Sequence, residues 1–294
     1  MTTEFFDYIL EHLDKPWDFK ELSINPNITY EMVLDHPELD WDWGYLGGNP
    51  NITWDMIMDF NIYKTWNYHL ISSNPNITWD IIMDNPNFPW DYFAVARNEN
   101  ILFDMFLKND KHMTCYSSFS INPNVNIDII KNNPMCKWDW VQLTMNENIT
   151  WEDIQSTPTL PWKYGWLEYN PNITLDIVMD NDLPNGNSWN RNQLSSNPNI
   201  TWDMIEENKS WIEWDYTYLS ANPNISWDIV EEDKEINKYH EWDYEILSIN
   251  HNISFDIVEA HPEIKWCYTG LSKNHMKKYI WKNSRVASYP YILK

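Results

Sequence analysis

The sequence predicts an all-α fold, an α-solenoid of about eleven short helix-turn-helix repeats of about 24 residues stacked in a superhelix. The first observation is a phrase close to Asn-Pro-Asn-Ile-Thr-Trp-Asp that returns along nearly the whole chain. The second is the step between copies, which is 24 or 25 residues except for one step of 27 and one of 28. A period this regular is typical of one supersecondary unit stacked many times. The first Asn of the copies is Asn25, Asn49, Asn74, Asn98, Asn122, Asn146, Asn170, Asn197, Asn222 and Asn250, and a decayed copy opens at Asn274.

Helix A, the first helix of each predicted repeat, begins just after the phrase. The fourth residue after the first Asn is Thr or Ser in eight of ten copies, which is typical of a helix N-cap, and the exceptions are Leu102 and Asn126. The sixth residue is always acidic, and the positive end of the helix dipole favours a negative charge there. Pairs such as His36-Pro37 then predict that helix A ends within about two turns, because Pro cannot extend a helix. The acids are Glu31, Asp55, Asp80, Asp104, Asp128, Glu152, Asp176, Asp203, Asp228 and Asp256.

Helix B, the second helix, is indicated by three columns, positions at a fixed distance before the first Asn. Trp stands eight residues before it in ten of eleven copies, an aromatic residue six before it in ten, and an apolar residue three before it in all. We expect these columns to share one broad face of helix B and to form the core. Helices of about 8 residues are marginal alone, so stacking of the repeats must stabilise them. The Trp column is Trp17, Trp41, Trp66, Trp90, Trp138, Trp162, Trp189, Trp214, Trp242 and Trp266.

The repeats are expected to form one continuous domain. Residues 1–24 form a divergent N-terminal capping repeat, residues 25–273 the tandem helical-pair repeats, and residues 274–294 a basic C-terminal cap that would cover the last repeat. The Asn columns are expected to be structural, with side-chain amides bonded to the backbone of their own and neighbouring turns.

Several phrases carry a family resemblance. Ser73-Asn74-Pro75-Asn76-Ile77-Thr78-Trp79-Asp80 and Lys15-Pro16-Trp17-Asp18 resemble the tandem Asn-Pro-Asn-Ile-Thr-Trp repeat proteins that giant DNA viruses encode in many copies. The resemblance covers about residues 14 to 275, although the copies at Asn98 and Asn122 depart from the pattern. It implies a repeat architecture and a viral origin, with action in the host cytoplasm or the virion, and it carries over no catalytic role or ligand.

Composition disfavours several classes of protein. Lys plus Arg number 20 against 44 Asp plus Glu, and the net charge of −24 repels nucleic acid. Six Gly leave no phosphate-binding loop, and three widely spaced Cys form neither a disulfide framework nor a metal site. The eight scattered His show no metal spacing, so no metal or cofactor is expected. A leader pattern and an apolar run of membrane-spanning length are both missing from the sequence, so neither secretion nor membrane association is expected.

The function expected from the sequence is a non-catalytic repeat scaffold that mediates protein–protein interaction. The recurring polar residues have capping, turn or dipole roles, so no catalytic residue is assigned and an enzyme is not expected. The alternative is an acidic inhibitor that mimics nucleic acid and blocks a DNA- or RNA-binding enzyme. A weaker third reading is a sugar-binding module, since Trp rings stack on sugars.

Candidate binding residues lie four and five positions before each first Asn, where the chemistry changes from copy to copy. Tyr45, Trp166 and Tyr218 are the large amphipathic members and are predicted as anchors for a protein partner, although an ordinary half-packed face remains the alternative. A second candidate is a basic patch in the C-terminal segment that could dock an acidic partner or the acidic body of another copy, giving self-association. This patch is Lys277, Lys278, Lys282 and Arg285.

Overall fold

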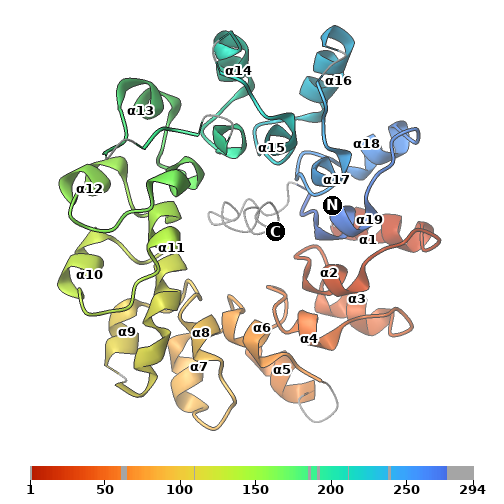
Figure 1. Cartoon of the computed structure of the whole chain (residues 1–294). Coiled ribbons are helices and arrows are strands. Elements are labelled where there is room, and N and C mark those ends of the chain that lie inside the picture. The colour runs from red at the N-terminus through yellow and green to blue at the C-terminus, as the bar shows by residue number, and fades with distance from the viewer. Residues whose placement is uncertain are drawn as a thin grey trace. The chain divides into compact units, whose positions relative to one another are not determined.

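The computed structural model consists of short helices joined by turns, and the residues that it describes contain no strand. These are residues 2–276, apart from 61–64, 109, 185–186, 191–192, 211 and 238–239. Helix A and helix B alternate through the described chain, which confirms the predicted all-α repeat fold (Figure 1). Apart from α1, η1 and α16, the helices have four to seven residues and are shorter than the sequence indicated.

Each repeat pairs one element of each kind. Helix A corresponds to α1 (Thr2–Glu11), α3 (Tyr30–Asp35), α5 (Trp54–Phe60), α7 (Trp79–Asp84), α9 (Phe103–Leu107), α10 (Ile127–Asn132), α12 (Trp151–Ser156), α13 (Leu175–Asp180), α14 (Trp202–Asn208), α16 (Trp227–Ile236) and α18 (Phe255–Ala260). Helix B corresponds to α2 (Phe19–Ile24), α4 (Trp43–Leu46), α6 (Tyr68–Ser73), α8 (Tyr92–Val95), η1 (Asp110–Ile121), α11 (Trp140–Met145), η2 (Tyr164–Tyr169), η4 (Gln193–Ser196), α15 (Tyr216–Ser220), α17 (Tyr244–Leu247) and α19 (Tyr268–Lys273).

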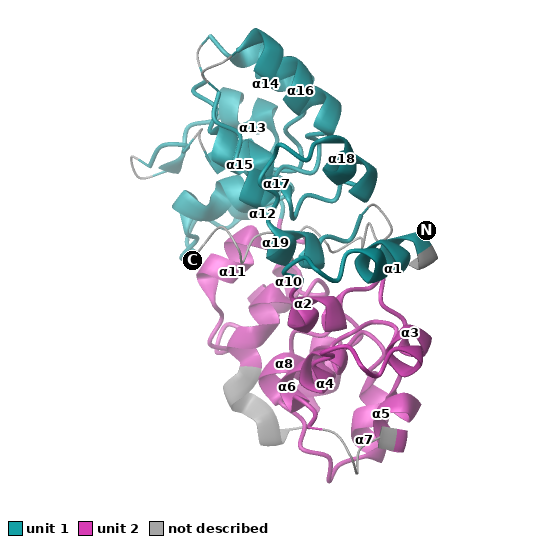
Figure 2. Cartoon of the chain, turned by 90° about the vertical axis from the view of Figure 1, so that its right-hand side faces the viewer, with its two compact units in different colours: residues 1–17, 150–294 teal, residues 18–149 magenta. Residues whose placement is uncertain are grey.

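The chain forms two compact units (Figure 2). Residues 18–149 make the central unit, and residues 1–17 together with 150–294 make the terminal unit. Within the central unit the helix B elements pack on one another in chain order from α2 to α11. The same order runs from η2 to α19 in the terminal unit. In each unit the helix A elements lie along one side of this stack (Figure 1).

The predicted core columns are buried in both units. The apolar residue three before the first Asn is almost completely buried in every copy, and so is the Ile or Val three after it. Eight of the ten Trp of the column are buried, while Trp66 and Trp189 are half-buried. The Trp column therefore belongs to the core, as predicted. A ring of this kind removes roughly 150–250 Å² from water, which helps to stabilise helices too short to stand alone.

The Trp column lies just before helix B, which corrects the expectation that it lies on that helix. In nine of the ten copies that have the Trp, helix B begins two residues after it, because the residue between them is the N-cap. Asp18 is such a cap, and its carboxylate accepts the backbone N–H groups of Lys20 and Glu21. In seven copies the Trp indole N–H donates to the carbonyl at the end of the preceding helix A, as from Trp41 to His36 O at 2.9 Å. Each such Trp thus satisfies one helix end and packs before the next helix begins.

The first Asn of a copy joins its repeat to the preceding one. The Asn74 side-chain oxygen accepts the backbone N–H of Asn76 at 2.8 Å, which closes the local turn. Its amide nitrogen lies 2.9 Å from the carbonyl oxygens of Gly47 and Asn49 and 3.2 Å from that of Ile52. Equivalent contacts recur in other copies of both units, and we call them the Asn ladder. They confirm the predicted structural role of the Asn columns and explain how a buried amide stays hydrogen-bonded.

The N-terminal helix packs against the last repeat of the terminal unit. Phe5 and Tyr8 of α1 stack on Phe255 at the start of α18, with ring centroids 5.2 and 4.0 Å away. The sequence assigned the cover of the last repeat to residues 274–294, of which 277–294 lie outside the described residues. In the structure, apolar cover for α18 comes from the opposite end of the chain.

Trp17 extends this contact in the manner of a regular repeat. It meets Tyr268 of α19 edge to face, with ring centroids 5.0 Å apart. The same contact joins successive repeats of this unit, as between Trp242 and Tyr216, whose centroids are 4.9 Å apart. Residues 1–17 therefore occupy the place beside the last repeat that a following repeat would occupy.

Candidate partner-binding surface

The predicted anchor of the central unit is Tyr45 on α4, four residues before Asn49. Its side chain is half-buried, and Lys20 Nζ of α2 lies 4.6 Å from the centre of its ring. A hydrogen bond with Tyr45 is the first cause that raises the pKa of the Lys20 ammonium group. Tyr45 thus has a partly exposed ring that lies next to the Lys20 ammonium group of the preceding repeat.

The two predicted anchors of the terminal unit are brought together by a third aromatic residue. Trp166 of η2 and Tyr218 of α15 are both half-buried, and Tyr169 is close to each of them. The ring centroids of Trp166 and Tyr169 are 5.8 Å apart. Burial first, and then the neighbouring Tyr218 phenol, raise the pKa of Tyr169 above its ordinary value. We call Trp166, Tyr169 and Tyr218 the aromatic group; the sequence missed Tyr169 because its position follows no column.

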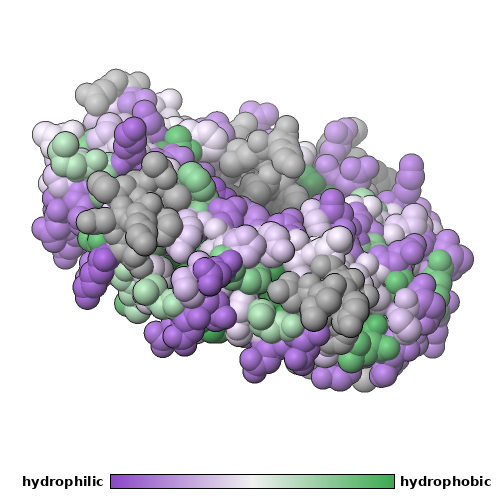
Figure 3. Space-filling view, turned by 90° about the horizontal axis from the view of Figure 1, so that it is seen from below, coloured by the Kyte–Doolittle hydropathy of each residue, from purple (hydrophilic) through white to green (hydrophobic). Residues whose placement is uncertain are grey.

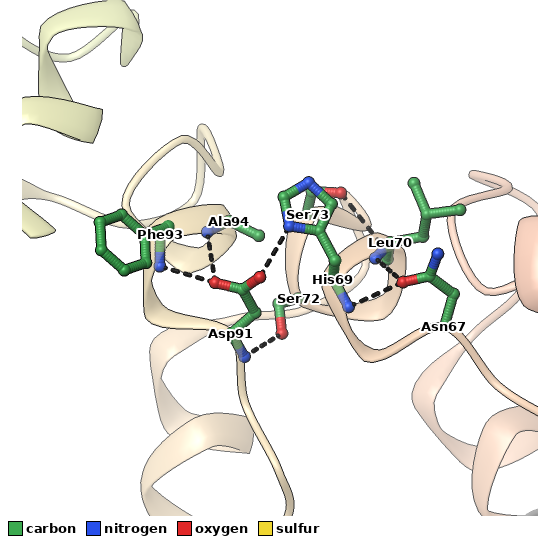
Figure 4. Close-up of polar contacts among 8 residues, drawn as sticks. All are labelled: Asn67, His69, Leu70, Ser72, Ser73, Asp91, Phe93 and Ala94. Carbon is green, nitrogen blue, oxygen red and sulfur yellow. Dashed lines mark hydrogen bonds and ion pairs between the residues drawn. The ribbon is translucent and has the colours of Figure 1, made fainter.

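The row of varying positions also makes contacts within the fold, as between α6 and α8 (Figure 4). The hydroxyl of Ser72 accepts the backbone N–H of Asp91 at 2.9 Å. One Asp91 carboxylate oxygen accepts the N–H groups of Phe93 and Ala94, and the other lies 2.7 Å from His69 Nδ1. Burial alone would raise the pKa of Asp91, but these hydrogen bonds outweigh it and hold the pKa below its usual value. At His69 the varying row therefore serves packing between repeats.

A buried carboxylate replaces a serine in the terminal unit. The residue two before the first Asn is Ser in seven of eleven copies, a column that sequence analysis missed, and in the copy of Asn170 it is Glu168. Glu168 is fully buried, and its Oε1 accepts the N–H of Asn190 at 2.5 Å, as the Ser hydroxyl does elsewhere. Its Oε2 has no hydrogen-bond partner, and burial raises the pKa of the carboxyl. Glu168 lies next to Tyr169 in the chain, so it borders the aromatic group.

A second buried carboxylate, Asp233, lies on the long helix α16. It accepts hydrogen bonds from Trp242 Nε1 at 2.9 Å, from Asn237 Nδ2 at 3.0 Å and, at 2.9 Å, contacts His240 Nδ1. In seven other copies the Trp donates to a backbone carbonyl at the end of helix A, so the Asp233 side chain replaces that carbonyl. The helix continues past this point, which accommodates the extra residues of the 28-residue step.

The outward side of helix A is lined with carboxylates. All ten acids of the sixth position after the first Asn are exposed. The space-filling view shows a mostly hydrophilic face on which hydrophobic residues form small separate patches (Figure 3). Four of the exposed large apolar side chains share one place on helix A, nine residues after the first Asn: Leu34, Met58, Met83 and Met179. In the last three regular copies the same place holds Glu206, Glu231 and Glu259.

The remaining predicted site lies beyond the described residues. The basic patch of Lys277, Lys278, Lys282 and Arg285 falls in the undescribed segment 277–294. Within the described part of the chain, no group of three or more His, Cys, Asp and Glu is arranged to hold a metal ion. Among those same residues, no helix is both long enough and apolar enough to span a bilayer. Comparisons with protein-family models, curated proteins and solved structures found no match to the chain.

Proposed function

We propose that the protein is a non-catalytic repeat scaffold that binds protein partners. The observation that supports this most is that each repeat contains both constant core positions and varying surface positions. The Asn ladder and the buried columns recur from copy to copy, whereas the side chains four residues before the first Asn and nine after it change. A surface that varies over a constant core is the usual origin of specificity in repeat proteins.

The aromatic group is the proposed anchor in the terminal unit, and Tyr45 the proposed anchor in the central unit. Trp and Tyr are enriched among residues that dominate binding energy, because they bury large area at low entropic cost. The resemblance to the viral repeat family leads us to propose action in the infected cytoplasm or the virion. The net charge of −24 favours a protein partner with a basic surface over nucleic acid.

Affinity capture tests this function. The full-length protein and a variant with Tyr45→Ala, Trp166→Ala and Tyr218→Ala would be used to capture partners from infected cells, with identification by mass spectrometry. Loss of specific partners in the variant is expected. Gln142→Ala, at the same row position of α11, is the matched control and should capture the wild-type set. An unchanged partner list for a triple variant that keeps its helical signal and melting would contradict the assignment of anchors.

The second candidate function is an acidic inhibitor that mimics nucleic acid. It is favoured by ten exposed carboxylates that recur at one position of helix A. Inhibition of a nucleic-acid-binding enzyme that disappears with rising salt would support it, because salt screens exposed charges. Asp55→Asn, Asp80→Asn and Asp104→Asn together should then weaken inhibition, whereas they should leave capture through the aromatic group unchanged. The sugar-binding reading has little support, because most rings of the Trp column are buried.

A further inference from the structure

Three exposed apolar side chains stand at one place in consecutive repeats of the central unit. Leu34 of α3, Met58 of α5 and Met83 of α7 all lie nine residues after the first Asn and are 46%, 42% and 49% exposed. The core does not require apolar side chains here, because later copies carry Lys131 and Gln155 at this place. We call Leu34, Met58 and Met83 the apolar stripe.

Exposed carboxylates flank the apolar stripe on both sides. Each stripe residue follows one acid by three positions and precedes another by one, and residues three apart lie side by side on a helix. The helices α3, α5 and α7 contain no Lys, Arg or His that would neutralise these groups. The surface thus combines an adaptable Leu and Met centre with negative edges. The flanking acids are Glu31, Asp35, Asp55, Asp59, Asp80 and Asp84, and all are exposed.

Side chains of neighbouring repeats lie close together around α3, α5 and α7. The pKa of the Tyr30 phenol is raised by burial and then by the carboxylates of Asp59 on α5 and Glu31 on α3. Acids of two neighbouring repeats therefore act on the same side chain. Further along, Trp54 of α5 packs against Phe88, which follows α7, with ring centroids 4.9 Å apart. The three stripe residues consequently lie at the same place on helices of consecutive repeats that pack near one another.

The partner chemistry that fits this surface is a segment both basic and apolar, and the chain carries one. Residues 277–294 contain Lys277, Lys278, Lys282, Arg285 and Lys294 and no acid, together with Tyr279, Ile280 and Trp281. The body that precedes this segment is strongly acidic, and the last acid of the whole chain is Glu263. Charge and apolar character are thus complementary between the segment and the stripe.

We propose that the C-terminal segment 277–294 of a second copy of the protein binds the apolar stripe. Its Lys and Arg side chains pair with the flanking carboxylates, and its aromatic and aliphatic side chains cover Leu34, Met58 and Met83. Three half-exposed side chains bury less than the roughly 1,200 Å² of a stable interface, so the contact is weak and salt-sensitive. This inference goes beyond the proposed scaffold function and does not depend on it, since a scaffold need not bind a second copy of itself.

Photo-crosslinking of the full-length chain tests the proposal. The photoreactive residue p-benzoylphenylalanine would replace Trp281, and crosslinked peptides would be mapped by mass spectrometry after irradiation at low salt. Crosslinks are expected to peptides containing α3, α5 or α7, and to fall about tenfold in 1 M salt, where the screening length is about 3 Å. In a mixture of isotopically heavy and light protein, crosslinks between heavy and light peptides are expected. Crosslinks only between peptides of the same isotope, crosslinks confined to α14, α16 and α18, or no crosslink at all, would overturn the proposal.

Methionine-methyl NMR provides a second measurement with a matched control. In the full-length variant Lys277→Glu, Lys278→Glu and Lys282→Glu, the methyl signals of Met58 and Met83 should shift from their wild-type positions. The Met179 signal should not shift. Met179 shares the same helix position and is 46% exposed, but the adjoining repeats carry Gln155 and Glu206 there. Unchanged signals of Met58 and Met83, or an equal shift of Met179, would refute binding at the stripe without bearing on partner capture by the aromatic group.

Discussion

The central and terminal units are built from the same repeat, but the repeat is more regular in the central unit. The steps within the central unit are 24 or 25 residues, whereas the terminal unit contains steps of 27 and 28. Both units keep the Trp column and the Asn ladder. Around the irregular steps of the terminal unit, buried carboxylates stand in for regular hydrogen-bond partners, Glu168 for a Ser hydroxyl and Asp233 for a helix-end carbonyl. Extra residues are therefore tolerated between two repeats where the N–H group of the following repeat still has a hydrogen-bond acceptor.

The two units also differ on the outward side of helix A. Nine residues after the first Asn, the central unit begins with Leu34, Met58 and Met83, and the terminal unit ends with Glu206, Glu231 and Glu259. This change leaves the buried columns unaltered. The comparison shows that the surface chemistry of each repeat is separable from the interactions that fold it.

The largest expected effect concerns the Trp column, which contributes to the core of each unit. Trp138→Ala in the central unit should cost about 3–5 kcal/mol of unfolding free energy, because the ring is buried and leaves a cavity. Trp189→Ala in the terminal unit should cost about half as much, since that ring is half-buried. Urea unfolding monitored by circular dichroism measures both. A loss below about 1 kcal/mol for Trp138→Ala would show that its ring is not part of the core.

The contact made by the N-terminal helix sets the terminal unit apart. Phe5→Ala should cost about 3 kcal/mol, because the buried ring stacks on Phe255. Hydrogen exchange should show faster exchange in α18 and α19 and no change in α6 and α8. The matched control is Leu13→Ala, which removes an exposed side chain and should change stability by less than about 0.5 kcal/mol. Uniform loss of protection in both units would mean that the terminal contact is not local.

Removing one side chain of the Asn ladder should lower the free energy of unfolding by a similar amount in both units. Asn122→Ala and Asn222→Ala should each cost about 2 kcal/mol, because each amide nitrogen lies within hydrogen-bond distance of three backbone carbonyls of the preceding repeat and its loss leaves buried acceptors unpaired. The exposed Asn87→Ala serves as the neutral control. Urea unfolding of the three variants tests whether the ladder is common to the two units; costs that differ by more than about 1 kcal/mol would show that it is not.

The smallest expected effects are pH dependences of opposite sign. Burial raises the pKa of Glu168, so its contribution to stability falls as the pH rises from the ordinary pKa of 4.5 through the raised pKa. Glu168→Gln should therefore stabilise the protein at neutral pH, by about 1 kcal/mol, and have less effect in acid. The pKa of Asp91 is lowered, so its contribution is present above 3.8 and is lost as the pH falls through the lowered pKa.

Urea unfolding of both variants across a pH series checks these signs. Asp91→Asn should weaken the protein at neutral pH, and its difference from wild type should shrink in strong acid. Parallel pH profiles for Glu168→Gln and Asp91→Asn would contradict the contrast between the two carboxylates.

Much of the fold was predictable from particular residues. Thr78 and Thr201 were recognised as N-caps from their place before an acidic first turn, and both accept the expected backbone N–H groups. The caps of helix B, such as Asp91, were missed because Trp-Asp pairs occur at both helix starts and the sequence does not separate the two roles. The sequence predicted the anchors only by their position in the repeat and did not predict their contacts. That Tyr169 joins Trp166 to Tyr218 depends on packing across repeats, which no column of the sequence encodes.

The period, the starts of helix A and the buried columns follow from the amino-acid sequence alone, because capping, turn formation and apolar spacing act over a few neighbouring residues and are restated in every copy. Tertiary structure decided the rest. It placed Phe5, Tyr8 and Trp17 against Phe255 and Tyr268, turned each ladder Asn toward the preceding repeat and left Leu34, Met58 and Met83 exposed. Such contacts join residues at least one repeat apart, so they depend on how whole repeats are oriented when they pack, and local sequence does not specify that orientation.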